Sequence, residues 1–526
     1  MIKHNIIKQI IVCGTVTILF LFSFISEKHF ITGEPHSFGY TTSKILYVVY
    51  CYFIVLFLYE FIKKIINKEI FYRKWFKNLS YIFVPYIGIL FLSWPGLVVW
   101  DEIWIYQNAT QFHIDDWQSY QTVYFYIFSL FLIPSFGMIV GSQITFMAFV
   151  SSWIITKLEF NYPLRFSKYK LVLIIIIVLS PAVLFNTLMT FRSTMLAIIE
   201  LWLVGLIYFS FKEKKCDNKT LIIIGFLTIL LSTWRKEGIY HVIFVPIAIW
   251  YLGIAARKRI VVFTLVTIVG VLVAGNIYGL IKGDEKQQMR YELTAFINPL
   301  SMILADKNAI ISEETSIQLN KVIDVEKTKE MASPYEVPSY WNGAVKDDFS
   351  EKDFKSFKKS YLKIVIDNLD IFLSSRTRTM ISSSGFSRYG YYPSDYINSY
   401  ILKNLDNDGA KLMLDNSLNR PININLRQFI VNILNWSKSF DNNIPNTLIF
   451  WNFSPVFIYL VIVIIRMRSL QNPIFWISVL LLLRVPLLFI TQPGSYFMYY
   501  YPMFLPGVFL MIIHFLEVKR RKSLAL

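Results

Sequence analysis

The chain has 526 residues, of which 55% are hydrophobic and 17% aromatic, and its mean hydropathy is +0.48. This composition excludes an ordinary soluble protein and predicts a polytopic membrane protein, because apolar runs of about 17 to 25 residues recur along most of the chain. The runs are continuously apolar rather than alternating, so we expect helices and not a barrel. The formal net charge of +17 would suggest nucleic-acid binding in a soluble protein, but here we interpret it through Lys and Arg placed in cytoplasmic loops.

Twelve segments are predicted to cross the membrane as helices. They cover residues 9–26, 44–62, 79–99, 138–156, 170–189, 194–211, 219–234, 238–254, 259–281, 447–466, 472–490 and 496–515. Lys and Arg then fall on alternate connections, which places both termini in the cytoplasm. The first segment lacks a small-residue cleavage site, so we interpret it as a retained helix.

The segment Tyr120–Leu132 is apolar but short, and it is followed by Pro134 and Gly137. Counting it as a crossing would place the basic loop 157–170 outside. We therefore expect an interfacial or re-entrant helix on the extracytoplasmic face. Only three cysteines occur, which excludes a disulfide framework and a cysteine-based metal site.

A polar stretch of about 165 residues, 282–446, separates the ninth and tenth predicted crossings. Its length and aromatic content exclude a simple linker, and amphipathic segments within it indicate helices. We therefore expect an all-α chain of three parts. They are an N-terminal transmembrane module (1–281) with a first acidic loop (100–137), a mainly helical extracytoplasmic domain (282–446), and C-terminal transmembrane helices with a basic cytoplasmic tail (447–526).

The unusual polar groups at the membrane edges fall nearly all on the predicted extracytoplasmic side. The first acidic loop contributes Asp101, Glu102, Gln107, His113, Asp115, Asp116, Trp117 and Gln118, and later edges contribute Arg192, Arg235, Lys236 and Arg484. Ionised groups near lipid are costly unless they face a polar cavity or a ligand. Arg192, Arg235 and Lys236 break the positive-inside bias in short loops, which favours a specific anionic partner.

Carboxylates beside a few cations suit a reaction with an anionic leaving group and a nucleophile that must lose a proton. A carboxylate base would take the proton of an acceptor hydroxyl while guanidinium groups hold the departing phosphate. Glycosyl transfer from a lipid phosphate fits these requirements. One base suffices for an inverting displacement, whereas a retaining one needs a second carboxylate as nucleophile, and the sequence leaves both open.

Each group also has a purely structural interpretation. Arg235 and Lys236 could anchor helix ends at the interface, and Arg192 could pair with Glu200 or Asp101. The tyrosines at 496 and 499–501 are typical of an interfacial aromatic belt.

Several short motifs carry a resemblance to a known superfamily. The chain has Trp94-Pro95-Gly96, Trp100-Asp101-Glu102, Asp116-Trp117, Trp234-Arg235-Lys236-Glu237-Gly238 and Tyr499-Tyr500-Tyr501-Pro502, in that order. Over residues 79–515 it resembles the GT-C superfamily of membrane glycosyltransferases, closely the uncharacterised bacterial multipass members and more distantly the protein O-mannosyltransferases and aminoarabinose transferases. It departs from these relatives at Gln118-Ser119, where they carry His-Pro, and at Lys236-Glu237, where they carry Asn-Asn.

The resemblance implies a polyprenyl-phosphate-linked sugar donor, a cell-surface glycan or glycopolymer acceptor, and an extracytoplasmic active site in the cell membrane. It makes Asp101 the catalytic base, with Glu102 supporting it or positioning the acceptor, and the other outer-face residues would bind substrate. It leaves a divalent cation open, because oligosaccharyltransferases use one and O-mannosyltransferases do not. His113 has no second histidine at ligand spacing, which favours a loop residue over a metal ligand.

Two other functions fit parts of the pattern. The first is a lipid-linked polysaccharide polymerase or ligase, in which Arg376, Arg378, Arg388 and Arg420 could hold a diphosphate. The second is a lipid-linked sugar flippase or other transporter, although the sequence has neither an internal repeat nor charged helices near the midplane. Nucleic acid is not an expected partner.

Overall fold

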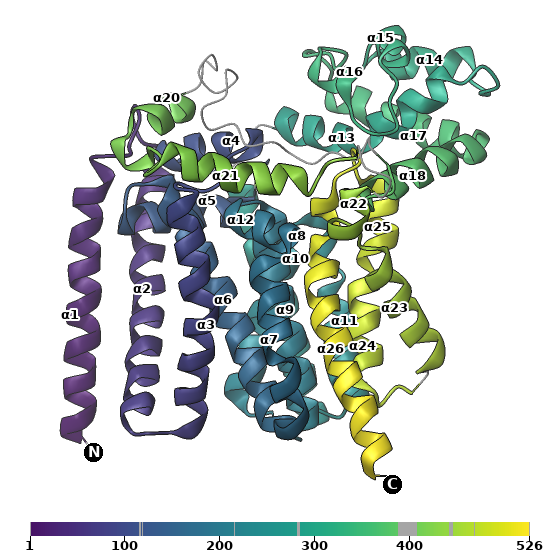
Figure 1. The fold of residues 1–526 in the computed structure, drawn as a ribbon. Coiled ribbons are helices and arrows are strands. Elements are labelled where there is room, and N and C mark those ends of the chain that lie inside the picture. Colours follow the sequence, from purple (N-terminus) through teal and green to yellow (C-terminus); the bar gives the residue numbers. More distant parts are fainter. Residues whose placement is uncertain are drawn as a thin grey trace. The chain divides into compact units, whose positions relative to one another are not determined.

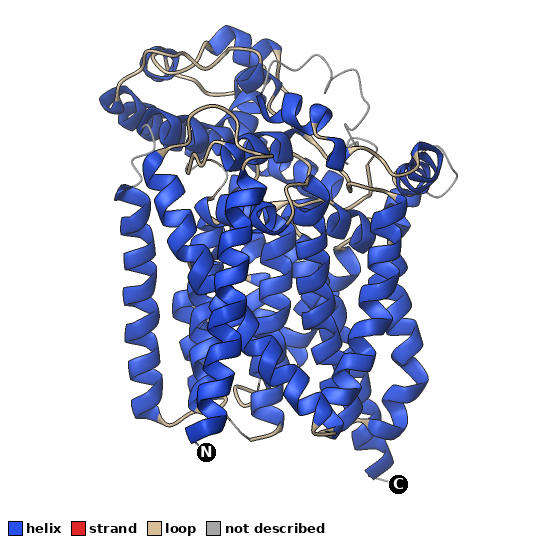
Figure 2. Ribbon diagram, turned by 90° about the vertical axis from the view of Figure 1, so that its left-hand side faces the viewer, coloured by secondary structure: helices blue, strands red, loops and turns tan. Residues whose placement is uncertain are grey.

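The computed structural model describes residues 2–114, 117, 119–214, 216–280, 285–387, 408–440, 445–467 and 469–524. These residues form helices joined by loops, and no strand occurs among them (Figures 1 and 2). The predicted all-α fold class is therefore confirmed. Asp115, Asp116, Gln118 and Arg388 lie outside the described residues.

Among the described residues, nine helical segments are long and apolar enough to cross a membrane, or ten if a bent pair counts as one. These segments are formed by α1 (Ile2–Glu27), α2 (Ser37–Ile66), α3 (Ile70–Leu92), α6 (Phe136–Asn161), α9 (Arg192–Lys212), α12 (Arg257–Leu280), α22 with α23 (Asn446–Phe450 and Ser454–Arg466), α24 with α25 (Pro473–Leu482 and Arg484–Thr491) and α26 (Tyr501–Leu524). The chain is thus a multi-pass membrane protein.

The remaining predicted crossings are helical but shorter or bent. Helices α7 (Pro163–Leu179) and α8 (Pro181–Leu188) meet at an angle of 50°. Pro181 explains the bend, because a proline disfavours helical backbone in the residue before it and has no N–H to donate. Helices α10 (Asn218–Trp234) and α11 (His241–Tyr251) have 17 and 11 residues. Twelve crossings therefore stay a prediction.

The predicted crossing 79–99 is wrong at its C-terminal end, because α3 already ends at Leu92. Pro95 and Gly96 account for this early end. Gly96 has a φ of +105°, and a Cβ at this position would lie 2.7 Å from the Val140 side chain and 3.0 Å from the Leu188 carbonyl oxygen. Only glycine combines that backbone conformation with so close an approach.

The chain divides into two compact units. Unit 1 comprises residues 1–234, 394–436 and 508–526, and unit 2 comprises residues 235–393 and 437–507. In unit 1 the two chain ends and the turn between α2 and α3 lie at one end of the helices (Figure 1). The other end carries α4 (Trp100–Thr110), α5 (Tyr120–Leu132), α20 (Asp408–Asp415), η2 (Ser417–Asn419) and α21 (Ile424–Trp436).

Helix α5 has the bounds expected for the short apolar segment. Its side chains are mostly buried against α1, α4 and α6. It is therefore a packed part of unit 1, and its depth in the membrane stays a prediction.

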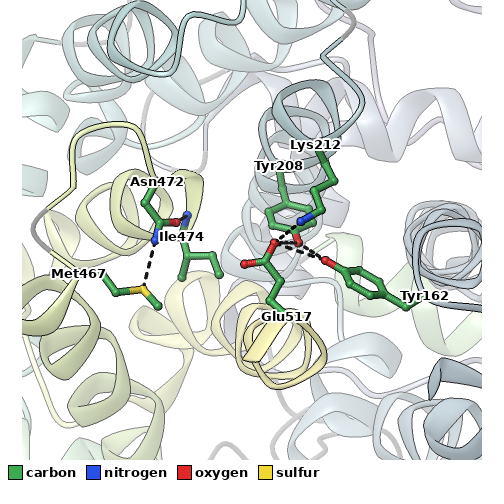
Figure 3. A network of polar contacts seen from close by, with 7 residues as sticks. All are labelled: Tyr162, Tyr208, Lys212, Met467, Asn472, Ile474 and Glu517. Carbon is green, nitrogen blue, oxygen red and sulfur yellow. Dashed lines mark hydrogen bonds and ion pairs between the residues drawn. The ribbon is translucent and has the colours of Figure 1, made fainter. Parts of the chain in front are cut away.

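The end of unit 1 that holds the chain termini is fixed by a polar network (Figure 3). Lys212 donates to the Glu517 carboxylate at 2.6 Å, and the Tyr208 and Tyr162 hydroxyls donate to the same oxygen at 2.8 and 3.3 Å. This network joins the C-terminal end of α9 to α26. Lys212, one of the basic residues that indicate the cytoplasmic side, therefore also stabilises the packing of these two helices.

Unit 2 contains the other membrane helices and a group of polar helices. The polar group is formed by α13 (Glu285–Ala305), α14 (Glu313–Asn320), α15 (Val325–Glu330), α16 (Pro338–Trp341), α17 (Glu351–Asp367) and α18 (Leu369–Ser383). Helix α13 packs against α17 and α18 through buried side chains such as Ile297 and Phe357. The described parts of the segment predicted to be a helical extracytoplasmic domain are thus mainly helical, but α20 and α21 belong to unit 1.

The membrane helix α24 of unit 2 is capped by Asn472, whose side chain accepts from the Ile474 N–H at 3.0 Å (Figure 3).

Candidate active site

The segment between α3 and α4 runs beside the connection between α8 and α9. The Leu97 N–H donates to the Leu188 carbonyl oxygen at 3.0 Å, and Leu97 forms a parallel bridge with Met189. Gln143 of α6 holds the same connection, since its amide nitrogen lies 3.2, 2.9 and 2.9 Å from the carbonyl oxygens of Asn186, Thr187 and Met189. Two loops distant in sequence are thereby fixed next to each other.

Asp101 and Glu102 occupy the first turn of α4. Carboxylates are favoured there because the helix dipole presents partial positive charge at this end. The two side chains nevertheless differ in environment, since Asp101 is partly exposed and Glu102 is completely buried. The sequence gives no sign of this difference, because the residues are adjacent and chemically similar.

The Glu102 carboxyl has one satisfied oxygen. Oε2 accepts from the Val99 N–H at 3.0 Å, whereas Oε1 is buried and has no hydrogen-bond partner among the described residues. Burial raises the pKa of Glu102 well above its usual range, and the neighbouring charge of Asp101 raises it further. A buried carboxyl with a raised pKa therefore lies next to the more accessible Asp101.

Tyr126 of α5 belongs to the same cluster. Its hydroxyl lies 2.5 Å from the Thr190 hydroxyl, in the connection between α8 and α9. Burial raises the pKa of Tyr126 well above its usual range. Tyr126 and Thr190 were not among the predicted site residues. A single tyrosine in an apolar segment has the same sequence pattern whether it serves a site or only packs in the protein core.

Arg192 begins α9 and completes the cluster. Its Nη1 donates to the Trp117 carbonyl oxygen at 2.8 Å, and its positive charge lowers the pKa of Glu102 against the larger effect of burial. Three predicted site residues, Asp101, Glu102 and Arg192, thus lie together in unit 1. Trp117 takes part through its backbone.

The other described residues of the acidic loop lie further along it. Gln107 packs under α20, where a Cβ on Gly409 would come within 2.8 Å of the Gln107 backbone nitrogen. The His113 ring lies 4.8 Å from the His36 ring, centroid to centroid. His36 is the neighbouring histidine that spacing in sequence did not reveal. Among the described residues, no group of three His, Cys, Asp or Glu side chains could hold a metal ion.

Unit 2 holds a separate cluster of charges. Arg235 donates to both carboxylate oxygens of Glu237, at 3.2 Å from Nε and 2.8 Å from Nη2, and its guanidinium lies 5.1 Å from the Tyr499 ring centre. Lys236 lies 5.0 Å from the ring centre of Tyr291. Glu237 therefore supplies a counter-charge for Arg235 that the sequence analysis did not consider.

Arg484 of α25 acts on the same carboxylate. Burial alone would raise the pKa of Glu237, but the charge and hydrogen bonds of Arg235, with a smaller contribution from buried Arg484, lower it to about 2. Arg235 and Arg484 thus place two guanidinium groups near the Glu237 carboxylate. Arg235, Lys236 and Arg484 stay predicted anion-binding residues.

Three of the four arginines considered for a diphosphate, Arg376, Arg378 and Arg420, are among the described residues. Arg376 is fully buried and donates to the carbonyl oxygens of Phe489 and Gln492 at 2.8 and 2.6 Å and to Asn298 Oδ1 at 2.7 Å. It thus satisfies backbone groups at the C-terminal end of α25. Arg378 is exposed, and Arg420 belongs to unit 1.

Comparison with known proteins gives no relative. No family model, no curated protein and no solved structure matches this chain.

Proposed function

We propose that the chain is a membrane glycosyltransferase of the GT-C type. It transfers a sugar from a polyprenyl-phosphate donor to a cell-surface glycan acceptor on the extracytoplasmic face. The observation that carries this proposal is the cluster in unit 1, in which the accessible carboxylate of Asp101 lies beside the buried Glu102 and the charge of Arg192. Such a transfer requires a base and a cation in one site, and here the base lies at the start of α4 and the cation at the start of α9.

The reaction needs one base and one group that stabilises phosphate. Asp101 takes the proton of the acceptor hydroxyl, whose oxygen forms a bond to the anomeric carbon of the sugar. The bond between that carbon and the phosphate oxygen breaks, and the oxygen keeps the electron pair. The products are a glycosylated acceptor, a polyprenyl phosphate and a proton on Asp101. Arg192 stabilises the negative charge that returns to the phosphate.

Glu102 supports the base without acting as one. The raised pKa of Glu102 favours its uncharged form, which reduces charge repulsion beside Asp101. Its hydrogen bond from the Val99 N–H also fixes the first turn of α4 and with it the position of Asp101. Asp101 is therefore the catalytic residue and Glu102 a positioning residue.

Glycan analysis of cells carrying Asp101→Asn tests the function. We expect the loss of one sugar substituent from a surface glycan, detected by mass spectrometry, with unchanged protein level. Glu34→Gln is the matched control, because Glu34 is an exposed acid in unit 1, outside the cluster. Unaltered glycans in Asp101→Asn would refute the transferase, and loss of whole polymer length would favour a polymerase instead.

A further inference from the structure

Helix α21 is attached firmly to unit 1. Its Arg427 is buried and donates from Nη2 to the Gly96 carbonyl oxygen at 3.0 Å. The chain just before α21 is held as well, because the Trp94 indole N–H donates to the Leu418 carbonyl oxygen at 2.7 Å and the Phe136 N–H donates to Asn419 Oδ1 at the same distance. The position of α21 next to the end of α3 is thus fixed by several hydrogen bonds.

The surface of α21 has three faces when its side chains are placed at about 100° per residue. The inner face contains the buried residues Arg427, Val431 and Leu434. A second face contains Leu426, Phe429, Ile433 and Trp436, which are 44, 59, 42 and 54% exposed. The third face contains the exposed amides Gln428, Asn432 and Asn435. Ile424, at the first position, is 59% exposed and lies on the amide side. Beyond it, the outward surface of the helix is divided lengthwise into an apolar part and an amide part.

Helix α21 lies beside the end of a candidate membrane helix. Figure 1 shows α21 crossing the end of the upright helices of unit 1, and it packs against α3. Helix α3 is one of the candidate membrane spans, and it exposes Phe91 and Leu92 in its last turn. Helix α21 thus lies at the level where a candidate membrane span ends, and both helices expose apolar side chains there.

We propose that α21 is an interfacial helix that lies in the outer boundary of the bilayer, with Leu426, Phe429, Ile433 and Trp436 among the acyl chains and its amides in water. The partner is the lipid bilayer itself, whose polarity changes over a short depth from hydrocarbon to water. The only charged side chain of α21 is Arg427, which faces inward, so the insertion requires no anionic lipid. This inference does not depend on the proposed enzymatic function.

Spin-label accessibility in the reconstituted full-length chain tests the proposal. The native cysteines Cys13, Cys51 and Cys216 are first replaced by alanine, and single cysteines are then introduced at Phe429, Ile433, Gln428 and Asn432 for nitroxide labelling. The protein is placed in nanodiscs of phosphatidylcholine. Collisions are measured with oxygen, which concentrates in hydrocarbon, and with a water-soluble nickel chelate.

Labels at 429 and 433 are expected to collide several-fold more with oxygen, relative to the nickel chelate, than labels at 428 and 432. Equal ratios on both faces, or strong collisions of all four labels with the chelate, would contradict the proposal. Protection of 429 and 433 from both reagents would also overturn it, because the face would then be covered by protein. Spin–spin broadening between those labels would identify that protein as a second copy.

Discussion

Two adjacent carboxyl groups at the start of α4 have different environments. Asp101 is partly exposed, whereas Glu102 is buried with only one of its oxygens hydrogen-bonded among the described residues. Asp101 and Glu102 differ in burial because successive residues of a helix point about 100° apart, so adjacent side chains face different surroundings. In the proposed chemistry the partly exposed acid is the base, and the buried acid positions it.

Glu102→Gln tests the protonation of the buried acid. The folded-state pKa of Glu102 lies above its ordinary value of 4.5, so the native protein holds a proton that the unfolded chain loses, and the free energy of unfolding falls as the pH rises above that value. Glutamine removes this dependence. We expect the thermal stability of the variant, relative to the natural protein, to increase between about pH 5 and about pH 8.

Glu102→Ala is the companion variant, because it leaves the Val99 N–H without its acceptor and creates a cavity. We expect it to be less stable than Glu102→Gln at every pH. A constant stability difference between Glu102→Gln and the natural protein over this pH range would contradict a protonated Glu102.

The clusters at the ends of elements show what the sequence could predict and what it could not. Asp101 and Arg192 were found because charged groups at membrane edges stand out in an apolar chain. Tyr126 was not found, because its role depends on the packing of α5 against the α8–α9 connection. Glu237 was overlooked as the partner of Arg235, although only one residue separates them, because the turn at η1 (Lys236–Gly238) brings the two side chains together.

The contact between α20 and α4 leads to a prediction for Gly409. A Cβ at this position would lie 2.8 Å from the backbone nitrogen and 2.9 Å from the Cα of Gln107, and backbone atoms cannot move aside cheaply. Gly409→Ala should therefore destabilise unit 1 by about 1 to 3 kcal/mol and lower its melting temperature in detergent. Gly88→Ala on α3 is the control, because nothing lies within 4 Å of its Cβ position. Equal melting temperatures for the two variants would refute the close approach of α20.

The charge cluster at η1 leads to a prediction for Glu237. Its pKa of about 2 lies below the ordinary 4.5, so its contribution is fully present above 4.5 and is lost as the pH falls toward 2. The shift corresponds to about 3 kcal/mol. Glu237→Gln should lower the melting temperature at neutral pH, because Arg235 then lacks its counter-charge.

The double variant Arg235→Gln, Glu237→Gln serves as the control for that prediction. It removes both charges of the pair, so its loss of stability should be smaller than the sum of the two single losses. Additive losses would mean that the pair has no coupling energy.

At the scale of the whole molecule, composition alone predicted a helical multi-pass membrane protein. Two predicted crossings differ from the structure near prolines. Helix α3 ends before Pro95, and the crossing 170–189 is bent at Pro181, because an apolar run does not show where a helix ends or bends. The division into two units was also not visible in the sequence. Each unit is assembled from separate stretches of the chain, and only contacts between distant residues reveal this.

Native Cys216 provides a test of the membrane orientation. It lies between α9 and α10, next to the α9 end where Lys212 pairs with Glu517, and the charge pattern predicts that this end is cytoplasmic. A membrane-impermeant maleimide should label Trp104→Cys on α4 in intact cells but reach Cys216 only after permeabilisation. Trp104 is 39% exposed, so the introduced cysteine is accessible. Labelling of Cys216 in intact cells would contradict the predicted orientation and place this end of the helices outside the cell.

The most direct test of the central claim is the release of polyprenyl phosphate by the purified chain in nanodiscs, supplied with a panel of polyprenyl-phosphate sugars and a glycan acceptor. We expect release with at least one sugar, a fall of roughly 10²- to 10⁴-fold in Asp101→Asn, and substantial activity in Glu102→Gln. Equal release by the natural protein and Asp101→Asn, with both folded, would contradict the role of Asp101 as base.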